Sequence, residues 1–352
     1  MTTMQQTPHA QAPLADVRPA APLGYATPLA PLSAPSIIRS LWQNAGMLLV
    51  FVLMFICCAI FVDNFFSRVN LKGLLLSVTV VGMISCTMLF CLAAGDFDLS
   101  VGSVVAMGGM VGAVVSNWAD SALIGIAAGV ASGALVGLLN GFVIAQLGIN
   151  ALITTLATMQ IARGLAFQFA PGGASVGIRD RDFHRLGSWS DPVFHIGSPI
   201  WLMIVCFVVF GILLRYTTFG RNTLAIGGNP EAARLAGIRV TRTKMVIFTL
   251  QGALAAFAGV VLAARMTSGQ PTTGLGGQGL ELQVISACVL GGVSLTGGVG
   301  TIVGVIVGVL IMGTLNNVMN LLNIETFWQY IVSGGVLLAA VLLDRARTRK
   351  SV

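Results

Sequence analysis

Long apolar segments constrain this chain more than any other feature. A helix needs about 20 mainly apolar residues to cross the hydrocarbon core of a membrane. Ten segments approach that length: residues 46–62, 74–94, 101–117, 122–147, 151–169, 199–214, 246–264, 282–295, 301–318 and 327–343. The third and eighth are short, so broken or partly re-entrant helices are expected there. The sequence therefore predicts an all-α polytopic membrane protein with about ten transmembrane helices.

Composition excludes a soluble protein. Charged residues make up only 9% of the chain and hydrophobic residues 56%, whereas soluble domains hold about 25% charged residues. All six cysteines fall in apolar segments without metal-ligand spacing, so we expect buried thiols and no metal site. The basic residues that give the chain a net charge of +7 lie mainly beside the apolar segments. Membrane orientation accounts for it, and we expect lipid contact rather than a nucleic-acid partner.

The stretch from residue 215 to 245 is the basic centre of the chain. Positively charged loops favour the cytoplasmic side. With this stretch inside, an even number of spans places both termini in the cytoplasm. The loop contains six of the nineteen Lys and Arg residues, and Glu231 is its one acid. The six are Arg215, Arg221, Arg234, Arg239, Arg242 and Lys244.

A short helix is predicted inside this loop. Asn229 is a suitable N-cap, Pro230 a suitable first helical residue, Glu231 a carboxylate at the positive helix terminus, and Gly237 a helix-ending residue. A capped helix of about two turns with small side chains fits a groove on a partner protein. The alternative is an ordered loop without a partner. The small apolar surface is expected from Ala232, Ala233, Leu235, Ala236 and Ile238.

The run FGRNTLAIGGNPEAARLAGI resembles the coupling loop of the sugar-type ABC import permeases, a group that takes ribose, xylose, galactose or arabinose. Similarity to this group covers roughly residues 37–344. The resemblance implies a separate ATPase subunit that binds ATP and Mg²⁺, a periplasmic sugar-binding protein, and a second permease copy forming a homodimer. It also implies that the ATPase docks on Asn229, Pro230, Glu231, Ala232, Ala233, Arg234, Leu235, Ala236 and Gly237.

The chain has no phosphate-binding loop of its own. Such a loop needs a lysine directly after glycine, and none of the lysines, Lys72, Lys244 and Lys350, follows one. Neither an H-E-x-x-H zinc motif nor a G-x-S-x-G nucleophile motif occurs. We therefore expect no cofactor and no catalytic residue in this chain, and any ATPase must be another polypeptide.

Polar residues between and within the spans are candidates for the translocation pathway, because charges at membrane depth are costly. The run GDFDLSVGS places Asp96, Asp98 and Ser100 before the third span. It resembles a signature of the same family, and its Asp96 favours the arabinose members over the ribose members. The resemblance implies a broken segment lining the inner pathway. A simple helix cap by Asp98 or Ser100 is the alternative.

Five further residues complete the predicted pathway. Thr154 and Thr158 lie four residues apart in a stretch similar to the arabinose permeases, although threonine hydroxyls also bond their own helix backbone. Arg163 should point into the bundle or reach the outer surface. Glu281 and Gln283 are expected at the outer edge of the eighth span, either as a cap or as the mouth that receives sugar.

The predicted organisation has three parts. Residues 1–36 are expected to form a disordered cytoplasmic tail, residues 37–344 the transmembrane permease domain, and residues 345–352 a basic cytoplasmic tail. Residues 170–198 form an expected periplasmic loop. The favoured function is import of a pentose, with L-arabinose first and ribose, xylose, galactose or another sugar as alternatives. A secondary transporter working alone is the rival, but it requires paired membrane charges that are scarce here.

Overall fold

The computed structural model describes residues 34–192, 195–273 and 279–349 of the chain. The chain divides into two compact units, Met1–Trp42 and Gln43–Val352, and the second contains every element after α1. The elements are α1 (Ala34–Phe61), α2 (Arg68–Ser77), α3 (Thr79–Ala93), α4 (Val101–Ala119), α5 (Ala122–Ala145), α6 (Ala151–Gln168), η1 (Pro171–Gly173), β1 (Val176–Gly177), α7 (Arg181–Ser188), α8 (Ser198–Tyr216), α9 (Thr218–Gly228), α10 (Pro230–Leu235), α11 (Val240–Met266), β2 (Ser268–Gly269), α12 (Leu280–Leu290), α13 (Ile302–Leu321) and α14 (Thr326–Arg349).

Each of the ten expected apolar segments contains a helix. Three apolar helices are shorter than a span, Gly46–Phe61, Leu280–Leu290 and Thr326–Leu342, and the threonines and Arg163 of α6 lower its hydropathy. Length and hydropathy thus support a polytopic membrane protein without fixing the count at ten. Among the described residues, six helices are long and apolar enough to cross a membrane: Arg68–Ala93, Val101–Ala119, Ala122–Ala145, Ser198–Tyr216, Val240–Met266 and Ile302–Leu321.

The two segments predicted to be short behave differently. The α4 helix is continuous over 19 residues, so the expected break within it was wrong. The α12 helix has only 11 residues, which confirms a short eighth segment. The irregular backbone precedes α4 instead, at residues 96–100, although Asp98 and Ser100 are each only 1% exposed. Non-helical backbone inside a membrane bundle is tolerated where other protein segments cover it.

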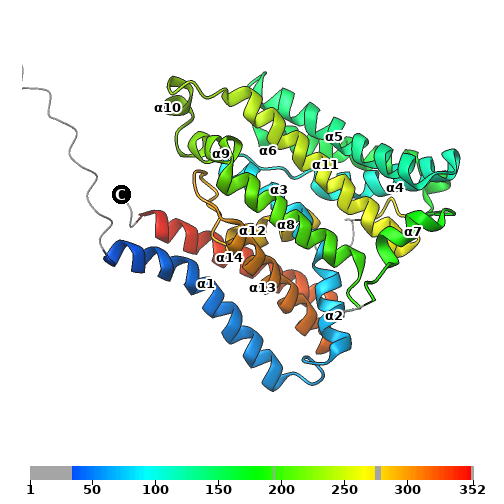
Figure 1. Cartoon of the computed structure of the whole chain (residues 1–352), viewed down its shortest axis with the longest axis horizontal. Coiled ribbons are helices and arrows are strands. Elements are labelled where there is room, and N and C mark those ends of the chain that lie inside the picture. Colours follow the sequence, from blue (N-terminus) through cyan, green and yellow to red (C-terminus); the bar gives the residue numbers. More distant parts are fainter. Residues whose placement is uncertain (1–33, 193–194, 274–278, 350–352) are drawn as a thin grey trace, which may run out of the picture. The chain divides into compact units, whose positions relative to one another are not determined.

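Close contacts among α4, α5 and α11 form the tightest part of the bundle (Figure 1). A Cβ atom on Gly133 would meet the Ala256 side chain, and one on Gly137 would meet the Phe248 backbone. Packing of this kind holds helices together in lipid, where no hydrophobic force acts between them. Small residues thus allow these three helices to approach one another closely. The buried glycines of α5 are Gly125, Gly129, Gly133, Gly137 and Gly141.

The two ends of the bundle carry different short helices. The α9 and α10 helices lie at the start of α11, and α7 lies at its end (Figure 1). We call these the α10 end and the α7 end. At the α7 end, β1 pairs with β2 in a two-stranded antiparallel sheet, with Val176 opposite Gly269. Arg265 donates a hydrogen bond from Nη1 to the Leu76 carbonyl oxygen at 3.1 Å, so the α2–α3 junction also lies at the α7 end.

Both long loops are more ordered than the sequence predicted. Residues 215–245 contain α9 in addition to the expected short helix. The Thr217 side chain accepts a hydrogen bond from the Gly220 amide at 3.3 Å and caps α9, which buries Gly220, Thr223 and Ile226. This face is too short to produce a clear helical periodicity. Residues 170–198 contain η1, β1 and α7.

Helices extend into both segments that the sequence analysis assigned to tails. The α1 helix already begins at Ala34, inside the segment assigned to the tail, and α14 continues to Arg349, through most of the basic segment 345–352. Helix propagation adds one hydrogen bond for each residue fixed, so a helix continues beyond its apolar stretch. Residues 1–33 and 350–352 lie outside the described residues, and the predictions for them remain predictions.

Candidate functional site

The amino-terminal end of α10 is capped as its sequence predicted. Asn229 Oδ1 accepts a hydrogen bond from the Ala232 amide at 3.0 Å. Pro230 is the first helical residue, and Glu231 lies in the first turn. These interactions fix the start of a helix that has only six residues. Such a short helix depends on its caps, because few backbone hydrogen bonds stabilise it.

The carboxyl-terminal end of α10 is closed by a Schellman motif. Gly237 has a φ of 83°, a left-handed conformation that glycine adopts without steric cost. Its amide donates to the Arg234 carbonyl oxygen at 3.0 Å. The Ile238 amide donates to the Ala233 carbonyl oxygen, also at 3.0 Å. The predicted end of the helix at Gly237 is confirmed.

The surface of α10 presents one large apolar side chain to the outside. Ala233 turns inward and packs on Ile226 of α9. Leu235 points the other way and is 89% exposed. The charged pair Glu231 and Arg234 lies on the exposed surface, with 3.5 Å between Oε1 and Nη1. An exposed leucine with charged neighbours is the composition expected of a small docking surface.

A groove of about 490 Å³ lies beside α10 at this end of the bundle. The α9 helix forms one side, and the turn between α10 and α11 together with the first turns of α11 forms the other. Arg239 and Arg242 give it a positive charge. The groove therefore suits an acidic or polar surface on a partner. Its lining residues are Thr218, Phe219, Asn222, Ala236, Gly237, Ile238, Arg239, Arg242, Thr243 and Val246.

The end of α9 touches the transmembrane bundle directly. A Cβ atom on Gly227 would meet the carbonyl oxygen of Ala93, the last residue of α3. The Gly298 amide, in the turn between α12 and α13, donates to the same carbonyl oxygen at 2.9 Å. A Cβ atom on Gly297 would lie 2.8 Å from the Gly227 backbone, so these two segments also meet backbone against backbone. Because no side chain separates these segments, α9 cannot shift toward the bundle without displacing α3 or the α12–α13 turn.

An ion pair joins the same two regions. The Lys244 ammonium in α11 lies 2.8 Å from Asp96 Oδ2, in the irregular segment after α3. The side chains are only 18% and 12% exposed. Burial raises the pKa of the Asp96 carboxyl, and the charge and hydrogen bond of Lys244 oppose this rise. The ion pair thus fixes the start of α11 to the end of α3.

Asp98 and Ser100 form a buried polar cluster that covers the break before α4. Asp98 Oδ1 accepts hydrogen bonds from the Ser100 amide at 2.9 Å and the Ser100 hydroxyl at 2.6 Å. Asn140 of α5 donates to Ser100 Oγ at 3.2 Å. Burial raises the pKa of the Asp98 carboxyl, and the two bonds from Ser100 oppose the rise. The cluster forms a turn directly before α4. Asp98 bonds to Ser100 and not to an amide inside the helix, and the Ser100 side chain makes no capping hydrogen bond, so the structure does not support the capping alternative. A pathway role for Asp96, Asp98 and Ser100 stays a prediction.

The α6 candidates are placed among α4 and α5. Thr154 and Thr158 are each 5% exposed, and their hydroxyls donate to the carbonyl oxygens of Asn150 at 3.0 Å and Thr154 at 3.2 Å. These bonds within the helix support a structural role. Arg163 is half-buried and makes no ion pair with any residue that the structure describes. A pathway role for these three residues stays a prediction.

Glu281 and Gln283 face opposite sides of α12, because two residues turn a helix by about 200°. Glu281 lies inside the bundle: a Cβ atom on Gly102, in the first turn of α4, would lie 2.6 Å from its Oε2 atom. The role of Glu281 as a cap or at the mouth of the pathway stays a prediction. Gln283 instead lines two cavities between α12 and the neighbouring helices α13, α14 and α2.

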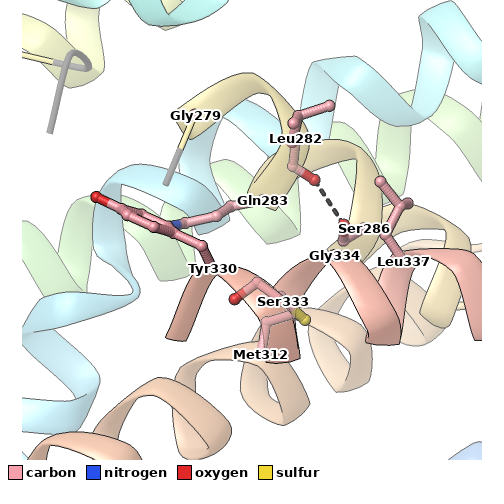
Figure 2. A pocket seen from close by; sticks show the side chains of 9 residues that line it. All are labelled: Gly279, Leu282, Gln283, Ser286, Met312, Tyr330, Ser333, Gly334 and Leu337. Atoms are coloured by element: carbon pink, nitrogen blue, oxygen red, sulfur yellow. Dashed lines mark hydrogen bonds between the residues drawn. The ribbon is translucent and has the colours of Figure 1, made fainter. Parts of the chain in front are cut away.

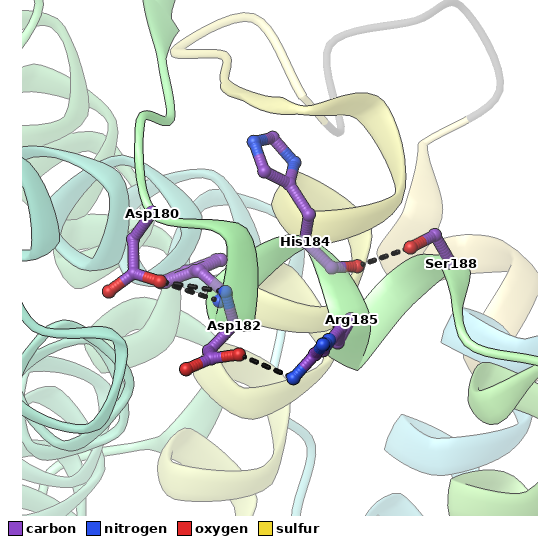
Figure 3. Close-up of polar contacts among 6 residues, drawn as sticks. Asp180, Asp182, His184, Arg185 and Ser188 are labelled. Atoms are coloured by element: carbon purple, nitrogen blue, oxygen red, sulfur yellow. Dashed lines mark hydrogen bonds and ion pairs between the residues drawn. The ribbon is translucent and has the colours of Figure 1, made fainter.

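The α7 helix organises part of the segment 170–198 at the α7 end of the bundle (Figure 3). Asp180 Oδ1 caps it by accepting from the Asp182 amide at 2.7 Å. Asp182 also pairs with Arg185, with 2.9 Å between Oδ1 and Nη1. Phe183 is fully buried and anchors the helix against the end of α11. The exposed charges of this segment are consequently held in a fixed arrangement.

Comparison with known proteins identifies the group to which the chain is related. Residues 70–341 match the family described as branched-chain amino acid transport system / permease component. The chain belongs to this permease family. It is a multi-pass inner-membrane permease component rather than an enzyme by itself, and permeases of this type work with a separate ATPase subunit and a binding protein.

Individual relatives of the permease are similar over nearly its whole length. It is 58% identical to the L-arabinose transport system permease protein AraH of Escherichia coli over 91% of this chain and 95% of that protein. Identity to the L-arabinose ABC transporter permease protein AraH of Azospirillum brasilense is 51%, over 91% and 92%. Identity to the ribose import permease protein RbsC of Bacillus subtilis is 40%, over 87% and 94%. No solved structure matches the chain.

Three features of the permease escaped the sequence analysis. The α9 helix was taken as loop, Lys244 was counted only as a topology charge, and Leu235 was treated as one of several equivalent apolar residues. Of these three features, only the Lys244–Asp96 contact could have been suspected from the sequence. Asp96 is an acid without a nearby basic residue in the chain, so a partner from a distant segment was to be expected. Among the described residues, no group of three or more His, Cys, Asp or Glu side chains is placed to hold a metal ion.

Proposed function

We propose that this chain forms the membrane pathway of a binding-protein-dependent ABC importer for L-arabinose. The observation that carries the proposal is the 58% identity to an L-arabinose permease over 91% of the chain, against 40% for a ribose permease. The scarcity of membrane charges agrees with a neutral cargo, because an ionic substrate would need a counter-charge in the pathway. Ribose, xylose and galactose are the competing substrates.

The proposed assembly has two copies of this permease, two ATPase subunits that hold ATP and Mg²⁺, and one periplasmic binding protein. Ten spans, formed by the ten apolar helical segments, place the α10 end and both termini in the cytoplasm. The positive charge of Arg239 and Arg242 at the α10 end supports this orientation. The ordered α7 segment then lies outside, where it is available to the binding protein.

In the proposed mechanism, closure of the two ATPase subunits moves α10. Ala233 and the backbone contact at Gly227 carry the movement through α9 to the end of α3 and the α12–α13 turn. The Lys244–Asp96 ion pair carries it from α11 to the same segment. Residues 229–237 transmit force and perform no chemistry. The bundle responds by opening toward the α7 end, where the binding protein releases the sugar.

Uptake measurements test the substrate assignment. Uptake of labelled L-arabinose at low concentration is measured in cells that lack this chain and in cells in which it is restored. Unlabelled ribose, xylose, galactose and fructose serve as competitors. We expect uptake to depend on the chain and to be inhibited mainly by L-arabinose. Unchanged arabinose uptake together with loss of another sugar's uptake would preserve the ABC importer function and exclude arabinose.

Reversing the charge of Arg234 tests the coupling role of α10. Arg234→Glu places two acids on the exposed surface of a six-residue helix and is expected to lower uptake by about tenfold, because like charges at an interface oppose association. Membrane insertion should not change, since Arg234 is exposed. Arg234→Lys, which keeps the charge, is the control. Normal uptake by well-inserted Arg234→Glu would remove this loop from the coupling role.

A further inference from the structure

A polar cavity of about 260 Å³ lies between the α2–α3 junction, α12 and α13. Ser77 and Val78 mark its end near the α2–α3 junction, and Val81 and Val309 lie further toward the α10 end. The Arg265 hydrogen bond to Leu76 places this junction at the α7 end. The cavity therefore runs from the α7 end into the bundle. It is much larger than the ~10–15 Å³ that one water needs and smaller than typical drug-sized sites of roughly 300–1,000 Å³.

The polar lining of this cavity is uncharged. It consists of the Ser77 hydroxyl and the amides of Gln283, Asn316, Asn317 and Asn320, and no Lys, Arg, Asp, Glu or His is among its lining residues. Amides and hydroxyls both donate and accept hydrogen bonds, as do sugar hydroxyls. The remaining lining is apolar, from valines and Met312. This combination matches a small neutral ligand with many hydroxyl groups better than an ion.

Two of the cavity's amides are held by partners. Asn317 exchanges two hydrogen bonds with Asn70, at 2.8 Å and 3.0 Å. Asn320 Oδ1 accepts from Gln329 at 3.0 Å. Asn316 Oδ1, by contrast, is buried and accepts no hydrogen bond from any residue that the structure describes. A buried acceptor without a partner costs free energy, which a ligand hydroxyl recovers when it binds.

A second cavity of about 180 Å³ adjoins the first, and both are lined by Gln283 and Met312 (Figure 2). Tyr330 and Ser333 of α14 line this second cavity. Ser333 Oγ is also buried without a hydrogen-bond partner among the described residues. The Tyr330 ring offers a flat apolar surface for the C–H face of a sugar ring. The two adjoining cavities thus contain two unused hydrogen-bonding atoms and one aromatic surface.

We propose that the adjoining cavities around Gln283 form a binding site for a neutral sugar of pentose size on its way through the permease. Asn316 and Ser333 donate or accept hydrogen bonds to the sugar hydroxyls, and Tyr330 packs on the ring. The site lies in the half of the bundle nearer the α7 end, where the sugar enters from the binding protein. This proposal rests on the proposed function as a sugar importer.

The test replaces Asn316 by leucine, which has a similar volume and no hydrogen-bonding group. Asn316→Leu is expected to lower L-arabinose uptake by about tenfold, the effect of losing one hydrogen bond to a buried acceptor. Its membrane level and its co-purification with the ATPase should equal those of the wild type. Gln168→Leu makes the same change at an exposed amide at the end of α6, away from both cavities, and should leave uptake unchanged.

A second measurement separates sugar contact from a purely structural role. The background variant has Cys57, Cys58 and Cys206 replaced by serine, which leaves the three buried cysteines Cys86, Cys91 and Cys288. Asn316→Cys then introduces one thiol that faces the cavity. Millimolar L-arabinose is expected to slow labelling of this thiol by a small water-soluble reagent, whereas sucrose at the same concentration should not. Sugar protection has no reason to occur if Asn316 only supports packing.

The outcomes distinguish this site from the importer function. If the wild type imports L-arabinose and Asn316→Leu imports it equally well, the proposed site is wrong and the importer function stands. The same holds if L-arabinose does not slow labelling of the thiol at position 316. A wild-type protein that imports none of the tested sugars would overturn both. Reduced uptake by Asn316→Leu together with sugar protection at position 316 would support the site.

Discussion

Leu235→Asp is expected to reach the membrane at the wild-type level and to import no more than about 5% of the wild-type amount of L-arabinose. Leu235 is 89% exposed on α10, so its replacement removes little packing within the permease. In the docked complex, aspartate would have to lose its water in an apolar contact without a partner. Loss of a central interface residue of this kind lowers the binding free energy by about 2 kcal/mol or more, which is roughly thirtyfold in affinity.

Co-purification of the ATPase with an affinity-tagged permease measures this effect directly. Leu235→Met keeps a flexible apolar side chain of similar size, so it should retain both the ATPase and uptake. The tagged Leu235→Asp protein should lose the ATPase while its own yield is unchanged. Retention of the ATPase by Leu235→Asp at the wild-type level would contradict the proposed docking surface on α10.

Lys244→Met is the second change with a large expected effect. It leaves the Asp96 carboxylate in a mostly buried position without its partner, which costs about 1–3 kcal/mol. The connection between the start of α11 and the end of α3 is lost at the same time. We expect uptake to fall by at least about tenfold, with a lower midpoint of thermal unfolding for the purified protein.

The double variant Asp96→Asn with Lys244→Met separates the two causes. Removing both charges eliminates the unpaired carboxylate, so thermal stability should recover most of what Lys244→Met loses. Uptake should recover less, because asparagine and methionine do not restore the link between α11 and α3. Equal uptake by the double variant and the wild type would show that the ion pair serves stability alone and carries no coupling.

The α10 helix shows how much of the candidate site is encoded locally. Asn229, Pro230 and Gly237 act through hydrogen bonds and backbone angles within a few residues, and these were predictable from residue types and spacing. The direction of each α10 side chain was not predictable. It depends on α9, whose Ile226 receives Ala233 and leaves Leu235 outside.

The α12 helix shows the opposite case. Its shortness was visible in the sequence, but the position of Glu281 against α4 was not. Likewise, Asn316 and Asn317 are adjacent and identical in type, yet Asn317 bonds to Asn70 of α2 while Asn316 Oδ1 has no hydrogen-bond partner among the described residues. Such differences depend on which helices become neighbours, and no periodic pattern records that information.

The sequence by itself determined the membrane class, the ten apolar helical segments and the caps of α10, because hydropathy and capping depend on residues close together in the chain. The tertiary structure alone decided the Lys244–Asp96 pair, the backbone contact between Gly227 and Ala93, and the polar cavity around Gln283. These contacts join residues that are distant in the chain. They form only when the helices pack against one another in the folded bundle, and the Gly227–Ala93 contact in addition requires a glycine.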